Sequence, residues 1–449
     1  MDFYAYLSIL GVLTMSAYRI LSLDGGGSWA LLQVMALQDL YGTKVRGHDV
    51  LRDFQLVSAN SGGSIVLGGL LTNLPLGDIL SFFRNESART SLFKALPFDF
   101  DSGSKPLKSV FNQTMHMVAT VGAKYQTSAK LEGLRNLLDP AGEKSLSEHH
   151  QNLVMRYGHA VHFLICGFDY DRKRAKFFRS NSASLAGSAQ IAPSFIPVPR
   201  RGGKKEPTLA DAIHASTNAP VNYFIEPARF ESSESETERY WDGAIGGYNN
   251  PVLAGVVEAM ANAKTYSIKD IQVLSIGTGT VSLPVRDKHA PSCDSRLVQE
   301  IGQESTLFRD VGQLATSVLD DPPDSASFIA HVVLGQKLPD RNGHPPVYPP
   351  VSGSVIRMSP LLRPARANPA APWMVPDGLS IREFDRLANL DLDAVAQDDI
   401  DLLGRFGQLW LSDRMGNQAI RENRNFEVQI GHRHFSAAKA GWLALRGGM

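Results

Sequence analysis

A strand, a glycine turn and an apolar helix follow one another twice near the start of the chain, and this order limits the fold more than any other feature. The first unit predicts a strand at residues 18–23 (YRILSL) and a helix at residues 29–41. The second unit predicts a strand at residues 54–58 and a helix at residues 64–74. Strands that alternate with helices predict an α/β domain with a central, mostly parallel sheet.

Further elements continue the alternation, with strands predicted at residues 161–169, 175–179 and 271–276 and amphipathic helices at residues 380–390 and 398–415. Before these two helices, prolines crowd residues 338–378 without a sustained period. Such a composition predicts a meandering surface segment or a linker.

Charge and cysteine content exclude several classes of protein. Lysine plus arginine and aspartate plus glutamate both total 45, so the formal net charge is zero, and no nucleic-acid polymer is expected as a partner. Two cysteines, Cys166 and Cys293, are too few for a disulfide framework or a four-ligand zinc site, and they suit a cytoplasmic location. No histidine or acid has metal-ligand spacing, so we expect neither a metal nor a cofactor.

The first residues of the chain predict neither a signal peptide nor a membrane span. Residues 4–13 are apolar, but no lysine or arginine precedes them, and they are too few to cross a bilayer. Met15 stands just before the first predicted strand, so translation begins either there or at Met1. Residues 1–17 are therefore expected to be an N-terminal extension, or a short helix packed on the core.

A serine stands at the sharp turn between the second strand and its helix. In Ala59-Asn60-Ser61-Gly62-Gly63 the glycines tolerate a tight backbone, and a serine at such a turn projects its hydroxyl above the sheet. The helix behind it favours the negative charge that develops in acyl transfer. Taken alone, the segment is better explained as a small-residue turn before a buried helix.

Three consecutive glycines form the first turn. Asp24-Gly25-Gly26-Gly27 can direct several backbone N–H groups into one space, which makes an anion nest. A dinucleotide fingerprint would need glycine where Ala30 stands, and no lysine of a Walker A loop follows. An oxyanion hole suits these amides better, although a tight βα turn explains them too.

An aspartate in a small-residue turn is the third feature. Trp241-Asp242-Gly243-Ala244 would let a carboxylate approach another group closely. A single Asp-Gly pair is more often only a turn, so this segment gains meaning from the other two.

In their order along the chain, these segments resemble the patatin-like phospholipase family. Residues 24–27 are similar to its glycine-rich oxyanion motif, residues 59–63 to its nucleophile elbow and residues 242–244 to its D-G-[GA] motif. Residues 212–224 (AIHASTNAPVNYF) are similar to its A-x-x-A-S-x-x-A-P segment, and residues 274–280 (LSIGTGT) to its S-x-G-T-G strand and turn. Five blocks in the right order are much more specific than any one.

The resemblance implies a lipid acyl hydrolase of phospholipase A type. Ser61 would be the nucleophile, Asp242 would accept its proton without a histidine, and the amides of Gly25, Gly26 and Gly27 would hold the oxyanion. A buried, apolar pocket would raise the pKa of the aspartate toward a useful range and would suit fatty acyl esters.

The chain departs from the family motifs at two positions, and it has two other candidates for the roles of base and nucleophile. The family usually has arginine or lysine where this chain has Trp29, and glycine where it has Ala59. His214 is the rival base, ranked below Asp242 because a histidine on a helix face is more often packed or solvated. Ser64 is the next candidate for the nucleophile.

The resemblance also implies a three-layer α/β/α fold with a C-terminal helical region. We expect a catalytic domain over residues 18–337, with residues 338–449 packed on it. The expected partner is a phospholipid or another lipid ester. Apolar and basic residues at 191–205 suggest peripheral membrane contact, or else a solvated loop, while the phenylalanines of residues 81–100 suggest a lid or core packing. Relatives switched by small molecules make an activator a further hypothesis.

Two other functions share the same residues. A soluble carboxylesterase or thioesterase would use the same chemistry on short acyl groups. A non-catalytic lipid-binding signalling module would result if Trp29 and Ala59 ended turnover.

Overall fold

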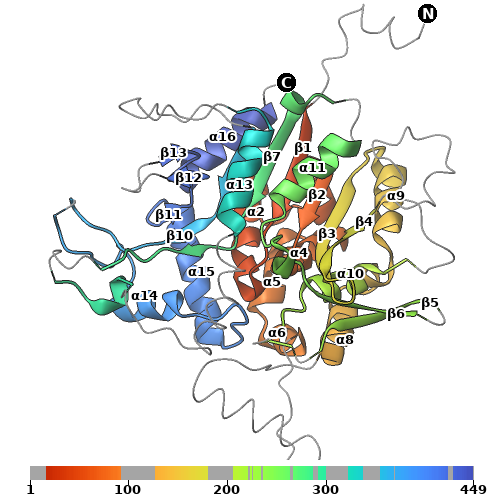
Figure 1. Ribbon diagram of the computed structural model, residues 1–449, viewed down its shortest axis with the longest axis horizontal. Coiled ribbons are helices and arrows are strands. Elements are labelled where there is room, and N and C mark those ends of the chain that lie inside the picture. Colours follow the sequence, from red (N-terminus) through yellow and green to blue (C-terminus); the bar gives the residue numbers. More distant parts are fainter. Residues whose placement is uncertain are drawn as a thin grey trace, which may run out of the picture.

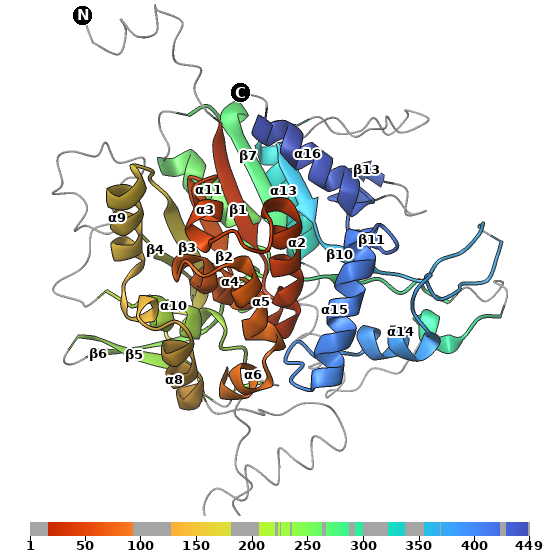
Figure 2. The same ribbon diagram turned by 180° about the vertical axis from the view of Figure 1, so that it is seen from behind.

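An eight-stranded sheet forms the centre of the molecule. The structure is a computed structural model that describes residues 17–92, 127–180, 206–220, 223–224, 226–233, 236–262, 266–286, 292–299, 322–336, 354–368, 370–422 and 428–447. The strand order is β5-β6-β3-β2-β1-β7-β9, with β4 also paired to β3. Helices cover both faces of the sheet, so the predicted three-layer α/β/α fold is confirmed (Figure 1, Figure 2).

The strands from β3 to β9 in this order are parallel. They are β3 (His162–Asp169), β2 (Leu56–Ala59), β1 (Tyr18–Leu23), β7 (Ile271–Ile276) and β9 (Val355–Met358). Antiparallel strands lie at the β3 side, namely β4 (Arg174–Arg179), β6 (Glu236–Asp242) and β5 (Ala228–Ser233). The carboxyl ends of the parallel strands therefore meet at one edge, where the turns after β1 and β2 lie side by side.

Both faces of β1 are buried, as expected for a parallel strand with helices on either side. Tyr18 and Ile20 belong to an apolar cluster shared with α11 (Val252–Asn262) and α13 (Pro322–Val333). Leu21 and Leu23 belong to a larger cluster on the other face. The main helices of that face are α2 (Leu31–Tyr41), α4 (Ser61–Leu71), α10 (Leu209–Ser216), α15 (Gln397–Leu411) and α16 (Phe435–Gly447).

Smaller elements surround this framework. Further helices are α3 (Gly47–Leu51), α5 (Leu76–Arg84), α6 (Glu86–Leu92), α8 (Thr127–Leu137), α9 (Leu146–Tyr157) and α14 (Ile381–Ala388). Short strands form a second sheet from β11 (Gly416–Asn417), β10 (Pro360–Leu362) and β8 (Thr280–Val281), and a pair from β12 (Arg421–Glu422) and β13 (Val428–Ile430).

The predicted elements agree with the structure best where strands are buried. The strands β1 and β7 begin and end at the predicted residues. Helix α4 instead begins at Ser61, three residues before its predicted start, so the elbow serine is its first residue. The prediction placed Gly62 and Gly63 in the turn because glycine is a poor helix former.

The prediction of a surface segment or linker over residues 338–378 is wrong for its central part. Val355–Met358 is strand β9, fully buried and parallel to β7 in the main sheet. The strand was missed because four residues are too few to show a period of hydrophobic residues, and because the charged Arg357 interrupts this apolar run. The C-terminal part of the chain thus contributes a strand to the central sheet, while the division at residue 337 stays a prediction. Residues 1–16 lie outside the described residues.

Candidate active site

Ser61 lies where β2 passes into α4. Its φ of 45° is positive, which is rare for a residue other than glycine and marks local backbone strain. Its amide donates a hydrogen bond to Ser216 Oγ at 2.9 Å. The preceding Ala59 ends β2 in extended conformation beside Leu23 of β1, and its side chain is fully buried. An extended backbone tolerates a methyl group, so Ala59 is compatible with the strained serine that follows.

The first turn of α4 packs directly on the glycine turn after β1. A β-carbon added to Gly62 would lie 2.6 Å from Gly27 O, and one added to Gly63 would lie 2.4 Å from Leu23 O. Neither position has room for a side chain. The two glycines therefore bring Ser61 and the glycine turn into contact.

The turn Asp24–Gly27, here called the glycine loop, offers amide donors beside Ser61. The Gly25 amide donates to Asn249 O at 2.8 Å. No amide hydrogen bond from Gly26 or Gly27 occurs within the part of the chain that the structure describes. A β-carbon added to Gly25 would lie 3.0 Å from Ser61 Cβ, and Gly27 has a φ of 53° that favours glycine. Two unengaged N–H groups thus belong to a loop in contact with the serine.

Asp242 ends β6 and is buried beside Ser61. Its Oδ1 accepts hydrogen bonds from Asn60 Nδ2 at 3.0 Å and from the Ala244 amide at 2.9 Å. The Ser61 side chain also lies close enough to this carboxyl group to lower its pKa. The Asp242 amide donates to Asn218 O at 3.0 Å, which fixes the backbone under the carboxylate. The structure therefore brings together the serine and the aspartate that the sequence singled out.

The surroundings of Asp242 act on its pKa in opposite directions. Burial raises the pKa, since a charged carboxylate loses its hydration. Hydrogen bonds from Ala244 and Asn60 lower it, and so do the nearby Ser61 side chain and the cation of Lys130. Burial is the largest of these effects, so the net direction is upward. A raised pKa makes this carboxylate a better proton acceptor than an exposed aspartate.

Lys130 of α8 is a buried basic residue that the sequence analysis did not single out. Its Nζ donates to His214 O at 3.1 Å and to Asn218 Oδ1 at 2.8 Å, and lies 4.0 Å from the centre of the Phe224 ring. Burial lowers the pKa of Lys130 well below its usual value. The sequence of α8 is that of an ordinary amphipathic helix, and only the three-dimensional structure shows that the Lys130 side chain points inward.

The structure supports neither of the two rival residues. His214 is buried in α10, where burial and the cations of Lys130 and Arg135 hold its pKa well below the usual value. Among the described residues, no hydrogen bond joins His214 to Ser61 or Asp242. The hydroxyl of Ser64 donates to Ser61 O at 2.6 Å. Neither residue has the geometry of a general base or a nucleophile here.

Trp29 fills a core position next to the glycine loop. Its side chain is buried, and its ring meets Phe406 of α15 edge to face, with 6.2 Å between ring centres. A β-carbon added to Gly279 would lie 3.3 Å from the Trp29 ring. The indole thus wedges between α15 and the turn after β7, in an apolar environment that would not accept a cation.

The predicted membrane elements are only partly covered by the structure. The tract at residues 191–205 lies outside the described residues, as do Phe93, Phe98 and Phe100. Phe82 and Phe83 belong to α5 and pack on the core, which supports core packing over a lid for this helix. None of the helices in the described ranges has both the length and the apolar character needed to cross a bilayer.

Comparison with known proteins gives one family and several distant structures. Residues 21–256 match the family described as patatin-like phospholipase. VipD from Legionella pneumophila has 10% identity and a TM-score of 0.34, covering 88% of this chain and 67% of VipD. Human GIVD cytosolic phospholipase A2 in complex with methyl gamma-linolenyl fluorophosphonate has 12% identity and a TM-score of 0.41, covering 96% of this chain. This chain spans only 60% of the human protein's length. No curated protein matches the sequence significantly.

Proposed function

Because the chain belongs to the patatin-like phospholipase family, whose members are lipid acyl hydrolases, we propose that it cleaves the acyl ester bonds of phospholipids or related lipids. Ser61 is the nucleophile and Asp242 the base of this proposal. The observation that carries it is the strained Ser61 at the start of α4, next to the buried carboxyl group of Asp242 and linked to it through the hydrogen bonds of Ser216 and Asn60. Strain of this kind is maintained only where the surrounding structure enforces it.

Acylation begins with attack of Ser61 Oγ on the carbonyl carbon of the ester. Asp242 accepts the serine proton as the new C–O bond forms, and the carbonyl π electrons move to oxygen. The resulting oxyanion requires hydrogen-bond donors that are already in place. The amides of Gly26 and Gly27 are the proposed donors, since the Gly25 amide already donates to Asn249 O.

Collapse of the tetrahedral intermediate breaks the bond to the leaving alcohol. Asp242 returns its proton to that alkoxide, so the lyso-lipid departs as a neutral alcohol and the acyl group stays on Ser61. Water then attacks the acyl carbon while Asp242 again accepts a proton. The second collapse releases the fatty acid and restores the Ser61 hydroxyl, so atoms and charges balance over the cycle.

Asn60 and Ser216 hold the reacting groups in register. The Asn60 side chain donates to Asp242 and accepts from Ser216 Oγ at 3.3 Å, while that same hydroxyl accepts from the Ser61 amide. This connected set of hydrogen bonds fixes the elbow relative to the carboxylate. Such preorganisation is what allows a weak base to serve a serine nucleophile.

The proposal is tested with esters of increasing chain length and with defined phospholipid vesicles. Wild-type protein should hydrolyse both, and Ser61→Ala should lose on the order of 10⁴-fold in kcat while keeping its melting temperature. A fluorophosphonate probe should label Ser61 in the wild type but not in Asp242→Asn. Ser64→Ala is the matched control, with a serine removed from the same helical turn. Substantial turnover by a folded Ser61→Ala variant would refute the assignment.

Hydrolysis of short esters without any action on vesicles would identify a soluble esterase instead. If the wild-type protein neither hydrolysed any of these substrates nor reacted with the fluorophosphonate probe, it would be a non-catalytic module. Contact with a membrane surface and control by a small molecule remain predictions from the sequence.

A further inference from the structure

A buried ion pair joins the glycine loop to a distant strand. Arg357 Nη2 lies 2.6 Å from Asp24 Oδ2, and the two side chains are only 3% and 4% exposed. Asp24 is the first residue of the loop, directly before Gly25. Arg357 belongs to β9, and the central strand β7 separates it from β1. The ion pair therefore spans the carboxyl end of β7 to reach the loop.

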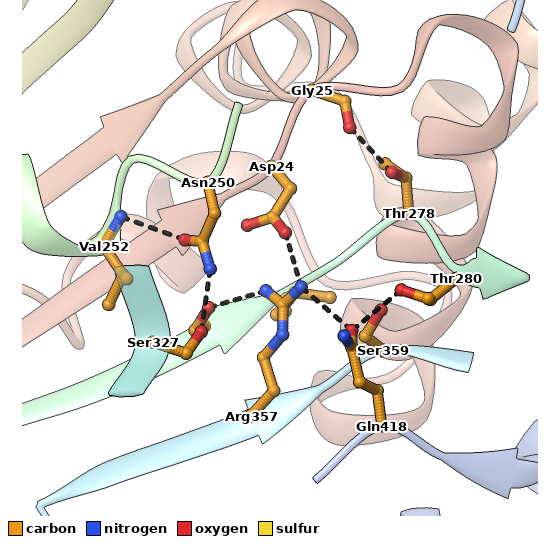
Figure 3. A network of polar contacts seen from close by, with 12 residues as sticks. Asp24, Gly25, Asn250, Val252, Thr278, Thr280, Ser327, Arg357, Ser359 and Gln418 are labelled. Atoms are coloured by element: carbon orange, nitrogen blue, oxygen red, sulfur yellow. Dashed lines mark hydrogen bonds and ion pairs between the residues drawn. The ribbon is translucent and has the colours of Figure 1, made fainter. Parts of the chain in front are cut away.

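The guanidinium is held in place by further contacts, as Figure 3 shows. Nη1 donates to Ser275 Oγ at 2.8 Å, and Nη2 also donates to Gln418 Oε1 at 3.4 Å. Gly277 leaves the space that the guanidinium occupies, since a β-carbon there would lie 2.7 Å from Arg357 Nη2. The planar guanidinium of Arg357 thus donates to one carboxylate and to two neutral oxygens, which fix its position and orientation.

Asp24 also contacts the elbow through its backbone. Its carbonyl oxygen accepts from the Gly63 amide at 3.1 Å and from Gln33 Nε2 at 2.9 Å. Its amide donates to Ile276 O at 3.1 Å. The side chain of Asp24 is thus held by β9, while its backbone is bonded to the first turn of α4. A shift of Asp24 would move the glycine loop relative to Ser61.

The glycine loop is otherwise held mainly by hydrogen bonds of its backbone, from the Gly25 amide to Asn249 O and from the Trp29 amide to Gly26 O. Thr278 Oγ1 donates to Gly25 O at 2.7 Å, beside the ion pair in Figure 3. The loop itself has no charged group other than Asp24, and Trp29 two residues after it is packed in an apolar site. Glycines are conformationally free, so a loop of three needs external contacts to hold one arrangement.

We propose that Arg357 is a positioning residue for the oxyanion hole, acting through Asp24 on the amides of Gly26 and Gly27. The inference rests on the proposed function, and it adds a residue outside the span that matches the family. Arg357 does not touch the reacting atoms. Its loss should therefore lower kcat and leave KM for a soluble ester nearly unchanged, because the oxyanion contacts strengthen only in the transition state.

The first variant is Arg357→Met, which keeps much of the side-chain length and removes the charge. It leaves the Asp24 carboxylate buried without its cation, so it destabilises the fold as well. The second variant, Asp24→Asn with Arg357→Met, removes both charges and should restore the melting temperature. In both variants we expect kcat to fall by about 10²-fold, the loss typical of a reacting group misplaced by 1 Å.

Two further variants separate positioning from packing. Arg357→Lys should recover part of kcat, since an ammonium can still reach Asp24 but cannot bond Ser275 at the same time. Arg179→Met breaks another largely buried ion pair of the sheet, to Glu258 at 2.8 Å, at a site away from the glycine loop. It should lower stability with little change in kcat.

Recovery of kcat together with the melting temperature in the double variant would overturn the positioning role and leave a purely structural pair. Amide hydrogen exchange is measured in parallel at the two amides whose hydrogen bonds depend on the position of the glycine loop, Gly25 (to Asn249 O) and Gly63 (to Asp24 O), and we expect faster exchange at both in the double variant than in the wild type. Equal exchange would also overturn the role, even if the wild type proved inactive. A wild type without turnover or fluorophosphonate labelling would instead refute the proposed function, so the two failures are distinguishable.

Discussion

Gly62→Ala tests the contact between the elbow and the glycine loop most directly. In an ordinary helix this change is favourable by up to about 1 kcal/mol, since alanine is the better helix former. Here the added methyl carbon would lie 2.6 Å from Gly27 O, 2.9 Å from Gly27 N and 2.9 Å from Ala30 Cβ. Two of these atoms are backbone, so no flexible side chain can move aside.

The size of the effect follows from that overlap. Ordinary contact between a methyl carbon and its neighbours begins near 3.5 Å, so Gly27 must move away from Ser61 by roughly 1 Å. A displacement of 1 Å in a reacting group costs about 10²-fold in rate, or about 2.7 kcal/mol of activation free energy. Overpacking should cost about 1 to 3 kcal/mol in stability, which helix propensity partly offsets.

The assay compares kcat, KM and melting temperature for hydrolysis of a p-nitrophenyl ester. Gly69→Ala is the matched control, because it makes the same change in the same helix. Its added methyl would lie 2.8 Å from Ile79 Cγ2, a side-chain atom that can yield, and well away from the glycine loop. We expect a low kcat and a cooperative melting transition at a somewhat lowered temperature for Gly62→Ala, and nearly wild-type kcat for Gly69→Ala. Equal kcat in the two variants would refute the argument that Gly62 sets the spacing between elbow and loop.

Other consequences are open to simple tests. Asn60→Ala removes a donor that stabilises the ionised carboxylate, so the pKa of Asp242 should rise further. As the solution is acidified, the variant should therefore lose activity at a higher pH than the wild type. An unchanged acid limb of the pH–activity profile would contradict this. Lys130→Met removes a nearby cation and should shift the same limb in the same direction; because both groups are buried, high salt should change this shift little, and a shift abolished by salt would contradict a direct effect. EDTA should leave hydrolysis of a soluble ester unchanged, and a loss reversed by added divalent ion would refute a metal-free mechanism. Replacing the four basic residues of 200–205 with serine should weaken binding to anionic vesicles but not soluble-ester turnover, and equal binding would dispose of that docking surface.

The proximity of Ser61 and Asp242, the proposed reactive residues, was predictable because the neighbours of each in sequence are also its neighbours in space. Ser61 follows a buried strand and precedes glycines, and Asp242 precedes Gly243 and Ala244. Each of these short segments encodes its own turn, so a local pattern is enough to find it. The register of β1 and β2 then places the glycine loop beside the elbow, as alternating strands and helices predict.

The supporting residues were not predictable, because their roles depend on contacts far along the chain. Arg357 lies in a tract rich in proline, and no local pattern connects it with Asp24. Lys130 occupies a helix whose other residues suggest a solvated surface, yet α8 directs it against α10. Strand β9 is only four residues long and carries a charged side chain, so its burial follows from pairing with β7 and not from its own composition. Such contacts are decided by tertiary packing, which outweighs local propensity.

The late position of β9 in the chain has a consequence for synthesis on the ribosome. Ser61, Asp242 and the glycine loop have all been synthesised well before Arg357 is added. Since folding begins at the N-terminal side during translation, the emerging chain can contain both reactive groups while Asp24 still lacks its cation. A nascent chain of this kind would hold a buried charge without its partner and a loop without its tether. The proposed hydrolase activity would then arise only after β9 has been synthesised and has joined the sheet beside β7.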